Sequence, residues 1–355
     1  MSRFLSPAHA ALRAYVPGEQ PRDRRYIKLN TNESPDPPAP AVIAALDKAR
    51  IEGLNRYPDP EVRALRALLA DANELAPENI VVGNGSDEIL TIAYLAFCDR
   101  AQGVAFPDIS YGFYAVYADL FGVPARTLPL QADFTIDPAD YFGAGRTILL
   151  ANPNAPTGLA LSHAQIEAIL RENPDHVVII DEAYVAFGGE SCAPLVKQYE
   201  NLIVVRTFSK SHALAGARLG YALADRALIE DMNRIRYCIN PYNVNALTAR
   251  IGEAAVCAEK YYQKSIENIV RTRAAVKNEL EMRGFICTDS RANFLFVRSD
   301  RLPGAAYYER LKERGVLIRR FGSPRIQDFS RVTIGSPEDM RAFLEATDRI
   351  LEECE

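Results

Sequence analysis

The chain has 355 residues, of which 48% are hydrophobic and 25% charged, and its formal net charge is −5 at pH 7. This composition is typical of a globular protein with one large domain and a smaller one, and the negative charge argues against a nucleic-acid-binding surface. No apolar run is long enough to span a membrane, the six cysteines form no C-x-x-C pair, and the four histidines lack metal-ligand spacing. We therefore expect a cytoplasmic protein without a metal site, with most cysteines as reduced core thiols.

The first 40 residues are rich in proline and predict an extended arm rather than a domain. The pattern then becomes helical from residue 40, and Val42, Ile43, Leu46 and Ala49 share one face of the expected helix. Three more helices are expected in this half of the chain: one over 60–73, one that begins at residue 86, and one over 111–121.

Short apolar runs alternate with the helices and predict strands at 80–82, 103–106, 147–151, 177–180, 202–206 and 219–222. This alternation indicates an α/β domain with a mostly parallel sheet. Further along the chain we expect one long helical region over 244–283, strands at 293–297, 316–318 and 331–334, and a helix from residue 337. The expected organisation is an arm (1–40), a large α/β domain (41–245) and a small α+β domain (246–355).

The segment with the clearest chemical potential follows the expected strand at 202–206. Lys210 lies there beside Ser209, and Arg218 comes eight residues later. A lysine that forms a Schiff base needs fixed geometry, while a hydroxyl and an arginine suit a phosphate ester. Taken alone, however, Lys210 is more simply interpreted as an ordinary loop lysine.

Three other polar segments follow expected strands. Asp181 ends an apolar strand, where a carboxylate faces the crevice that binds ligands and is suited to a pyridine nitrogen, although a helix cap explains it equally well. Gly85 and Ser86 open a helix, where free amides favour an anion, and here too an ordinary cap is an alternative. Residues 151–158 form a rigid turn on almost any interpretation. Their joint placement at strand ends is what favours a single site.

In this order the motifs resemble those of fold-type I pyridoxal-phosphate (PLP) enzymes, and among them the histidinol-phosphate aminotransferase family. The lysine segment with its downstream arginine is typical of the wider superfamily. The motifs that resemble the family itself cover 15–18, 28–35, 54–59, 110–112 and 331–335.

This resemblance implies a role for each of the following residues. Lys210 would hold PLP covalently and move the substrate proton, Asp181 would bind the pyridine nitrogen, and Tyr184 the ring hydroxyl. The remaining cofactor contacts would be Tyr111, stacked on the ring, with Gly85, Ser86, Asp87, Asn154, Ser209 and Arg218, joined by Tyr57 from the partner subunit of a homodimer. The residues expected to contact substrate are Arg331, Arg319, Tyr15 and Asn32.

One position departs from the family pattern. The family usually has Asn before Pro-Thr-Gly, where it bonds the ring hydroxyl, and this chain has Ala155. Asn152 or Asn154 could replace it, or Tyr184 could act alone.

The resemblance implies transfer of an amino group from histidinol phosphate to 2-oxoglutarate. An aromatic amino-acid aminotransferase and a phospho-amino-acid decarboxylase of the same fold remain alternatives. A non-catalytic α/β binding protein is an alternative from another class.

Overall fold

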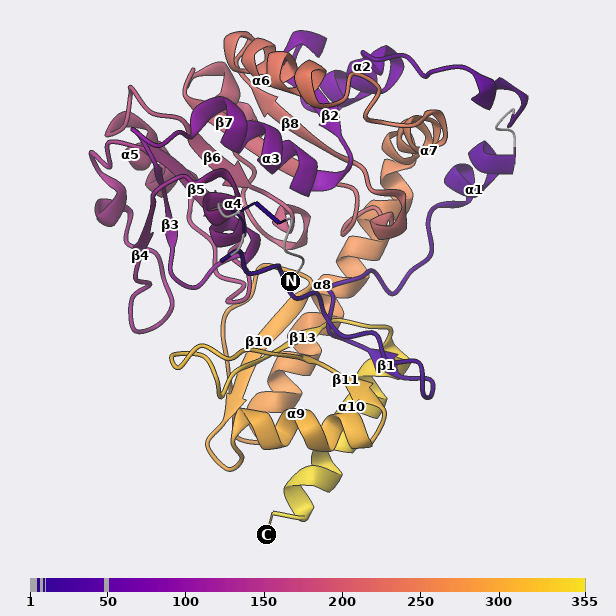
Figure 1. Ribbon diagram of the computed structural model, residues 1–355. Helices are drawn as coiled ribbons and strands as arrows, with labels where there is room; N and C mark the ends of the chain where they lie inside the picture. Colours follow the sequence, from indigo (N-terminus) through magenta and orange to yellow (C-terminus); the bar gives the residue numbers. More distant parts are fainter. Residues whose placement is uncertain (1–4, 7–8, 10, 48–50, 355) are drawn as a thin grey trace.

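The computed structural model describes residues 5–6, 9, 11–47 and 51–354. A large sheet with helices on both sides forms the upper part of the molecule in Figure 1, and a small sheet lies below it. The long helix α8 (Glu259–Met282) runs from one part to the other.

The large sheet has seven strands in the order β2-β8-β7-β6-β5-β3-β4. Strand β8 is antiparallel to both its neighbours and the other pairs are parallel, so the expectation of a mostly parallel sheet is confirmed. The strands are β2 (Ile80–Gly83), β3 (Val104–Pro107), β4 (Ala125–Leu128), β5 (Thr147–Ala151), β6 (Val178–Asp181), β7 (Leu202–Thr207) and β8 (Gly220–Ala224).

The central strands are apolar throughout because both faces of the sheet are covered. Successive residues of β5 enter different hydrophobic clusters: Ile148 and Leu150 pack on one side and Leu149 on the other. The first side is covered by α1 (Pro40–Asp47), α2 (Arg63–Ala72), α5 (His163–Arg171) and α7 (Ala246–Val256). The second side is covered by α3 (Gly85–Phe97), α4 (Phe113–Phe121) and α6 (Arg226–Ile239).

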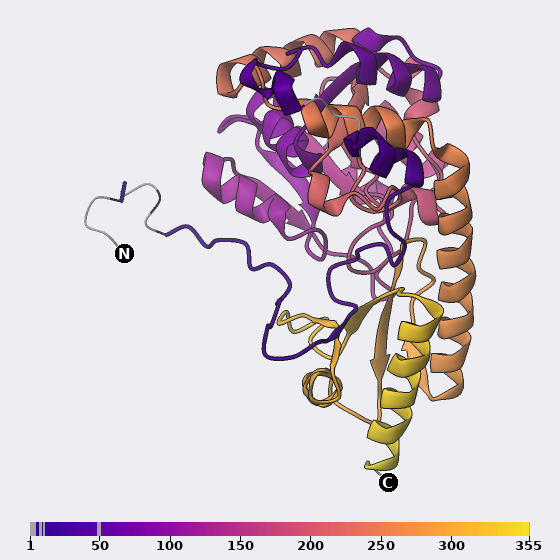
Figure 2. The ribbon, with the colours of Figure 1, turned by 90° about the vertical axis from the view of Figure 1, so that its right-hand side faces the viewer.

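The small sheet is antiparallel, in the order β12-β13-β10-β9. Its strands are β9 (Phe285–Cys287), β10 (Phe294–Ser299), β12 (Arg319–Arg320) and β13 (Ser330–Thr333), and the helices beside it are α8, α9 (Gly304–Glu313) and α10 (Pro337–Glu352). The arm joins this part through β1 (Ile27–Lys28), which pairs in parallel with β11 (Val316–Leu317). Figure 2 shows that the arm, from residue 11 onward, comes in from outside the sheets and then runs along this part.

Several sequence-based boundaries differ from the structure. The second helix begins at Arg63 rather than residue 60, because Val62 has a left-handed backbone (φ 47°) that no helix accommodates. The expected helical region 244–283 is two helices, α7 and α8, interrupted at Cys257 and Ala258. Helices α5, α6 and α9 and strands β1, β4, β9 and β12 were not expected from the sequence.

Two expectations about burial were wrong. In the single chain Ile43 and Leu46 are 50% and 45% exposed, whereas Val42 is buried, and Ala49 lies outside the described residues. The cysteines are free as expected, but only Cys98 and Cys192 among the six are buried, so the expectation that most are core thiols was wrong.

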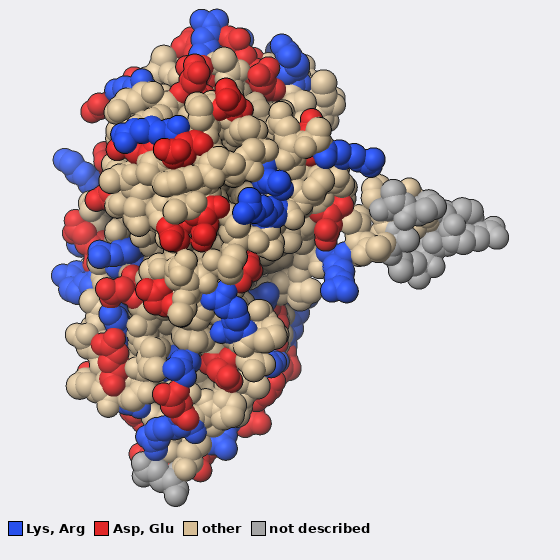
Figure 3. Space-filling view, turned by 90° about the vertical axis from the view of Figure 1, so that its left-hand side faces the viewer, with Lys and Arg blue, Asp and Glu red and all other residues tan. Residues whose placement is uncertain are grey.

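The surface has no extended region of one charge on the face in Figure 3, where acidic and basic side chains alternate. Within the described ranges no helix is long and apolar enough to cross a membrane. The same residues contain no group of three or more His, Cys, Asp or Glu side chains suited to a metal ion.

Candidate active site

A cavity of about 320 Å³ lies where β5, β6 and β7 end, and this size suits a small molecule. The arm and the small sheet complete its walls. Most residues singled out in the sequence line it: Tyr15, Asn32, Ser86, Asp87, Tyr111, Asp181, Tyr184, Ser209, Lys210, Arg218, Arg319 and Arg331. The fold thus brings together side chains that are up to 316 positions apart in the chain (331 − 15).

Asp181 is the last residue of β6 and is only 4% exposed. Its Oδ2 accepts a hydrogen bond from the Tyr114 hydroxyl at 2.9 Å, and its Oδ1 accepts one from the backbone N–H of Ala183 at 3.1 Å. Burial nevertheless raises the pKa of Asp181 to about 6. A ligand that brings a positive N–H group to this carboxylate would offset the cost of burying its charge.

Lys210 lies just beyond β7, in the loop that leads to β8. Its Nζ donates to the backbone oxygen of Thr31 at 3.2 Å and lies 5.8 Å from the centre of the Tyr184 ring. The amine therefore lies inside the cavity, where it is positioned to bond a carbonyl carbon of a ligand.

The start of α3 forms a cradle for an anion. Gly85 has φ +80°, a backbone conformation that favours glycine, and the guanidinium of Arg218 approaches it so closely that a Cβ atom there would lie 2.8 Å from Nη2. Ser86 and Arg218 line the cavity beside the free amides of the first helical turn. Asp87 binds Nη2 of Arg218 at 3.1 Å, so its carboxylate orients the guanidinium rather than contacting an anion itself.

Aromatic side chains form one wall. The Tyr111 hydroxyl donates to Oδ1 of Asp87 at 2.9 Å, which fixes the ring. Tyr15 from the arm stacks on Phe113 at 4.3 Å and meets Tyr111 edge-on at 6.2 Å. This wall offers a flat apolar surface to a planar ligand.

Two arginines approach from the small sheet. Arg331, on β13, donates from Nη2 to the backbone oxygen of Asn30 at 3.1 Å, while its buried Nε has no hydrogen-bond partner. Burial lowers the pKa of Arg331. Arg319 instead donates to the backbone oxygens of Pro17 and Val16 at 3.1 and 2.9 Å, and so holds the arm. Arg331 is thus the guanidinium with free capacity for an anionic ligand.

The structure does not bring every expected residue to the cavity. Tyr57 is 79% exposed and stacks on Tyr242 at 4.3 Å, outside the cavity of its own chain. Asn154 is buried in the turn after β5, where its amide accepts from Ser110 at 2.8 Å and donates to a backbone carbonyl, so it does not face the cavity. The expected contact from Asn154 is therefore not supported by its position.

Two contacts were missed in the sequence. Tyr114 holds Asp181, and it is signalled only by its helical spacing of three residues from Tyr111. Thr31 holds Lys210 through its backbone, which no side-chain pattern reveals.

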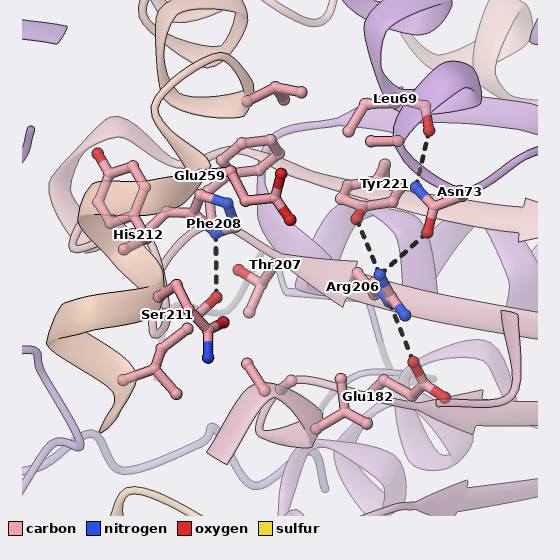
Figure 4. A pocket seen from close by; sticks show the side chains of 18 residues that line it. Leu69, Asn73, Glu182, Arg206, Thr207, Phe208, Ser211, His212, Tyr221 and Glu259 are labelled. Carbon is pink, nitrogen blue, oxygen red and sulfur yellow. Dashed lines mark hydrogen bonds and ion pairs between the residues drawn. The ribbon is translucent and has the colours of Figure 1, made fainter. Parts of the chain in front are cut away.

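A second cavity, of about 230 Å³, lies beside the first and shares Ala183 and Thr207 with it (Figure 4). Glu182 and Arg206 face each other there at 3.0 Å. Burial, with a contribution from Arg206, lowers the pKa of His212 to about 4, so its imidazole is neutral near pH 7. This ion pair joins the residue after β6 to β7, next to Asp181 at the end of β6 and to the loop after β7 that holds Lys210, and so supports the wall of the first cavity.

The comparisons with known proteins agree with one another. Residues 24–346 match the family "Aminotransferase class I and II". A histidinol-phosphate aminotransferase of Syntrophus aciditrophicus is 47% identical over 353 residues and 98% of each chain, and one of Brachyspira hyodysenteriae is 44% identical over 97% of this chain and 98% of its own. The crystal structure of the Sinorhizobium meliloti histidinol-phosphate aminotransferase in complex with PLP has a TM-score of 0.90 at 25% identity, covering 100% of this chain and 99% of that one.

The chain belongs to the histidinol-phosphate aminotransferase family. Ala155 departs from the pattern that the resemblance implies, and the structure limits which side chain could take the place of the expected asparagine. Asn152 bonds the backbone N–H and C=O of Leu161 at 2.7 and 3.1 Å, so its amide is occupied, like that of Asn154. Of the three alternatives, the one in which Tyr184 acts without an asparagine fits the geometry.

Proposed function

We propose that the protein transfers the amino group of histidinol phosphate to 2-oxoglutarate, using PLP, and that it acts as a cytoplasmic homodimer. The observation that carries this proposal is the convergence of three groups in one cavity: the amine of Lys210, the buried carboxylate of Asp181 and the guanidinium of Arg331.

The cavity fits PLP on its own chemistry. Asp181 offers a buried acceptor for a protonated ring nitrogen, and Lys210 offers an amine for the aldehyde carbon. Gly85 and Arg218 lie close together, with Ser86 beside them. The backbone N–H groups, the hydroxyl and the guanidinium there can together donate hydrogen bonds to the phosphate. When bound, PLP supplies an electron sink for the carbanion left when the substrate α-proton is removed.

The protein side chains account for the proton movements. With PLP in the cavity, Lys210 would hold the cofactor through Nζ, and its free amine would act as the general base that takes and returns the substrate proton. Asp181 would hold a protonated ring nitrogen through a charge-assisted hydrogen bond. Tyr114, which donates to the other carboxylate oxygen, holds Asp181 in place. Because the second half-reaction reverses the first, the kinetics should be ping-pong.

The position of Arg331 in the cavity supports the proposal that both substrates carry anionic groups. A planar guanidinium binds either a carboxylate or a phosphate through two parallel hydrogen bonds. Histidinol phosphate offers a phosphate, and 2-oxoglutarate offers carboxylates. Arg331 lines the cavity, so its guanidinium can meet such a group there.

Exposed apolar side chains support the dimer. Tyr57, Ile239 and Tyr242 are 79%, 53% and 39% exposed, and Tyr57 stacks on Tyr242. A partner chain that covers them would bring Tyr57 toward a second cavity, as expected from the family resemblance. Exposed apolar patches of this kind are typical of protein interfaces.

The test is a half-reaction screen. The PLP-loaded protein is mixed with one amino donor and no keto acid, and its visible absorption is followed. Histidinol phosphate should convert the cofactor fastest. Faster conversion by phenylalanine or tyrosine would identify an aromatic aminotransferase, carbon dioxide release without a keto acid would identify a decarboxylase, and a colourless protein that binds no PLP would favour a non-catalytic role.

A further inference from the structure

Asn32 is held on all sides by the protein. It has a left-handed backbone (φ 55°), a conformation that asparagine tolerates better than most residues, and it is 1% exposed. Its N–H donates to Oγ1 of Thr333 at 3.0 Å, and its backbone oxygen accepts from Nδ2 of Asn293 at 3.1 Å. Its side chain therefore has one position relative to the cavity wall.

The hydrogen-bond network also fixes the direction of the Asn32 amide. Because the Thr333 hydroxyl accepts from the backbone N–H of Asn32, its own proton goes to Oδ1 of Asn32, 3.0 Å away. The amide NH₂ is then the end that faces the Tyr184 hydroxyl, at 2.9 Å. Tyr184 thus accepts this hydrogen bond, and its own proton is free to point into the cavity.

The neighbouring wall has Ala155 where the resemblance implies an asparagine donor. Ala155 is 5% exposed and packs in a small apolar cluster with Ala292, Phe294 and Tyr184. The amides of Asn152 and Asn154 are occupied elsewhere. On this wall the Tyr184 proton is therefore the donor available to a ring oxygen.

Building on the proposed function, we infer that Asn32 is a positioning residue that fixes Tyr184 as the hydrogen-bond donor to the PLP ring oxygen. The resemblance had suggested that Asn32 contacts substrate. The geometry instead directs both ends of its amide to Thr333 and Tyr184. Thr333 lies two residues from Arg331 on β13, so the strand that presents Arg331 to the cavity also anchors this network.

The test is Asn32→Asp, which keeps the shape of the side chain but removes its donor. A carboxylate can only accept, so the Tyr184 proton would turn toward residue 32 and leave the ring oxygen. A donor on that oxygen weakens its hold on the proton of the adjacent lysine linkage. Its loss should therefore raise the pH midpoint of the visible absorption of bound PLP by roughly one to two units, and Tyr184→Phe should do the same.

The added charge of Asn32→Asp must be separated from the lost donor, and a double-mutant cycle does this. In the Tyr184→Phe background only the charge effect remains, so Asn32→Asp should shift the midpoint clearly less there than in the wild-type background. The other charged groups that face Tyr184 and the linkage in this cavity, Arg331 and Asp181, are unchanged throughout. Equal shifts in the two backgrounds would overturn the inference.

A second variant covers the case in which Asn32→Asp does not fold. Thr333→Val removes the proton that holds Oδ1 of Asn32, so the amide can turn over and the midpoint should rise in the same direction by a smaller amount. An unchanged midpoint in Thr333→Val would contradict the role of Asn32. A wild-type protein that binds no PLP would overturn the proposed function itself, whereas normal PLP binding with no shifts would overturn this inference alone.

Discussion

Replacing Asp181 by Asn should stabilise the PLP-free protein at neutral pH while it weakens cofactor binding. Burial raises the pKa of Asp181 from 3.8 to about 6 in the folded protein. A raised folded pKa means that the stabilising effect of the bound proton is complete below pH 4 and is lost as the pH rises through 6. At pH 8 the ionised, buried carboxylate therefore lowers the free energy of unfolding.

The size of this effect follows from the pKa shift. About two units correspond to about 3 kcal/mol between low and neutral pH, of which about 1.5 kcal/mol falls between pH 5 and pH 8. Asp181→Asn removes the titrating group. The free energy of unfolding of the variant, relative to that of wild type, should therefore be about 1.5 kcal/mol higher at pH 8 than at pH 5. Loss of the charge-assisted bond to the ring nitrogen should cost about 1.5–3 kcal/mol of PLP binding, or roughly tenfold to a hundredfold in affinity.

The assay is urea unfolding of both PLP-free proteins at pH 5 and pH 8, at one protein concentration because any association between chains would change the measured stability. Asp175→Asn, which changes an exposed carboxylate, is the matched control and should track wild type. The reasoning would be refuted if the stability difference between Asp181→Asn and wild type were the same at both pH values.

Three further predictions concern the proposed chemistry. Lys210→Ala should bind PLP without the absorption band of the lysine linkage and lose nearly all turnover; wild-type activity would refute the assignment of Lys210. Arg331→Lys should keep the PLP spectrum but lower kcat/KM for both histidinol phosphate and 2-oxoglutarate, by roughly tenfold to a hundredfold, because a point charge replaces a planar fork; unchanged constants for both substrates would show that Arg331 does not bind them. Mixing inactive Tyr57→Phe with inactive Lys210→Ala should restore activity in heterodimers, and no recovery despite proven subunit exchange would argue against a shared site.

The sequence was most informative where a polar residue ends a buried strand. Lys210 and Asp181 follow apolar runs that must be covered on both faces, so their positions at the sheet edge could be predicted from the pattern alone. The sequence was least informative where an element has no continuous apolar run. Strand β4 is exposed at three of its four positions and so shows no apolar run, and α5 was missed although Ser162 and Gln165 form a capping box.

Contacts between segments that are distant in the chain could not be predicted from the sequence for a different reason. The bond of Asn32 to Tyr184 depends on how the arm lies against β13, and the hold of Tyr114 on Asp181 depends on how α4 packs over β6. Neither geometry is encoded in a local pattern. Tyr57 is a further case, because one chain leaves it exposed and only a partner could place it at a cavity.

Two of the charged groups that line the cavity, Asp181 and Arg331, do not compensate each other. Asp181 is buried with neutral hydrogen-bond donors, Arg331 has an unpartnered Nε, and the two lie on different sheets without forming an ion pair. Each therefore keeps a desolvation cost in the ligand-free protein. A cationic ring nitrogen would relieve the first and an anionic substrate group the second. The same burial that weakens the empty protein thus makes both groups bind their ligands more strongly, since electrostatic attraction increases as water is excluded.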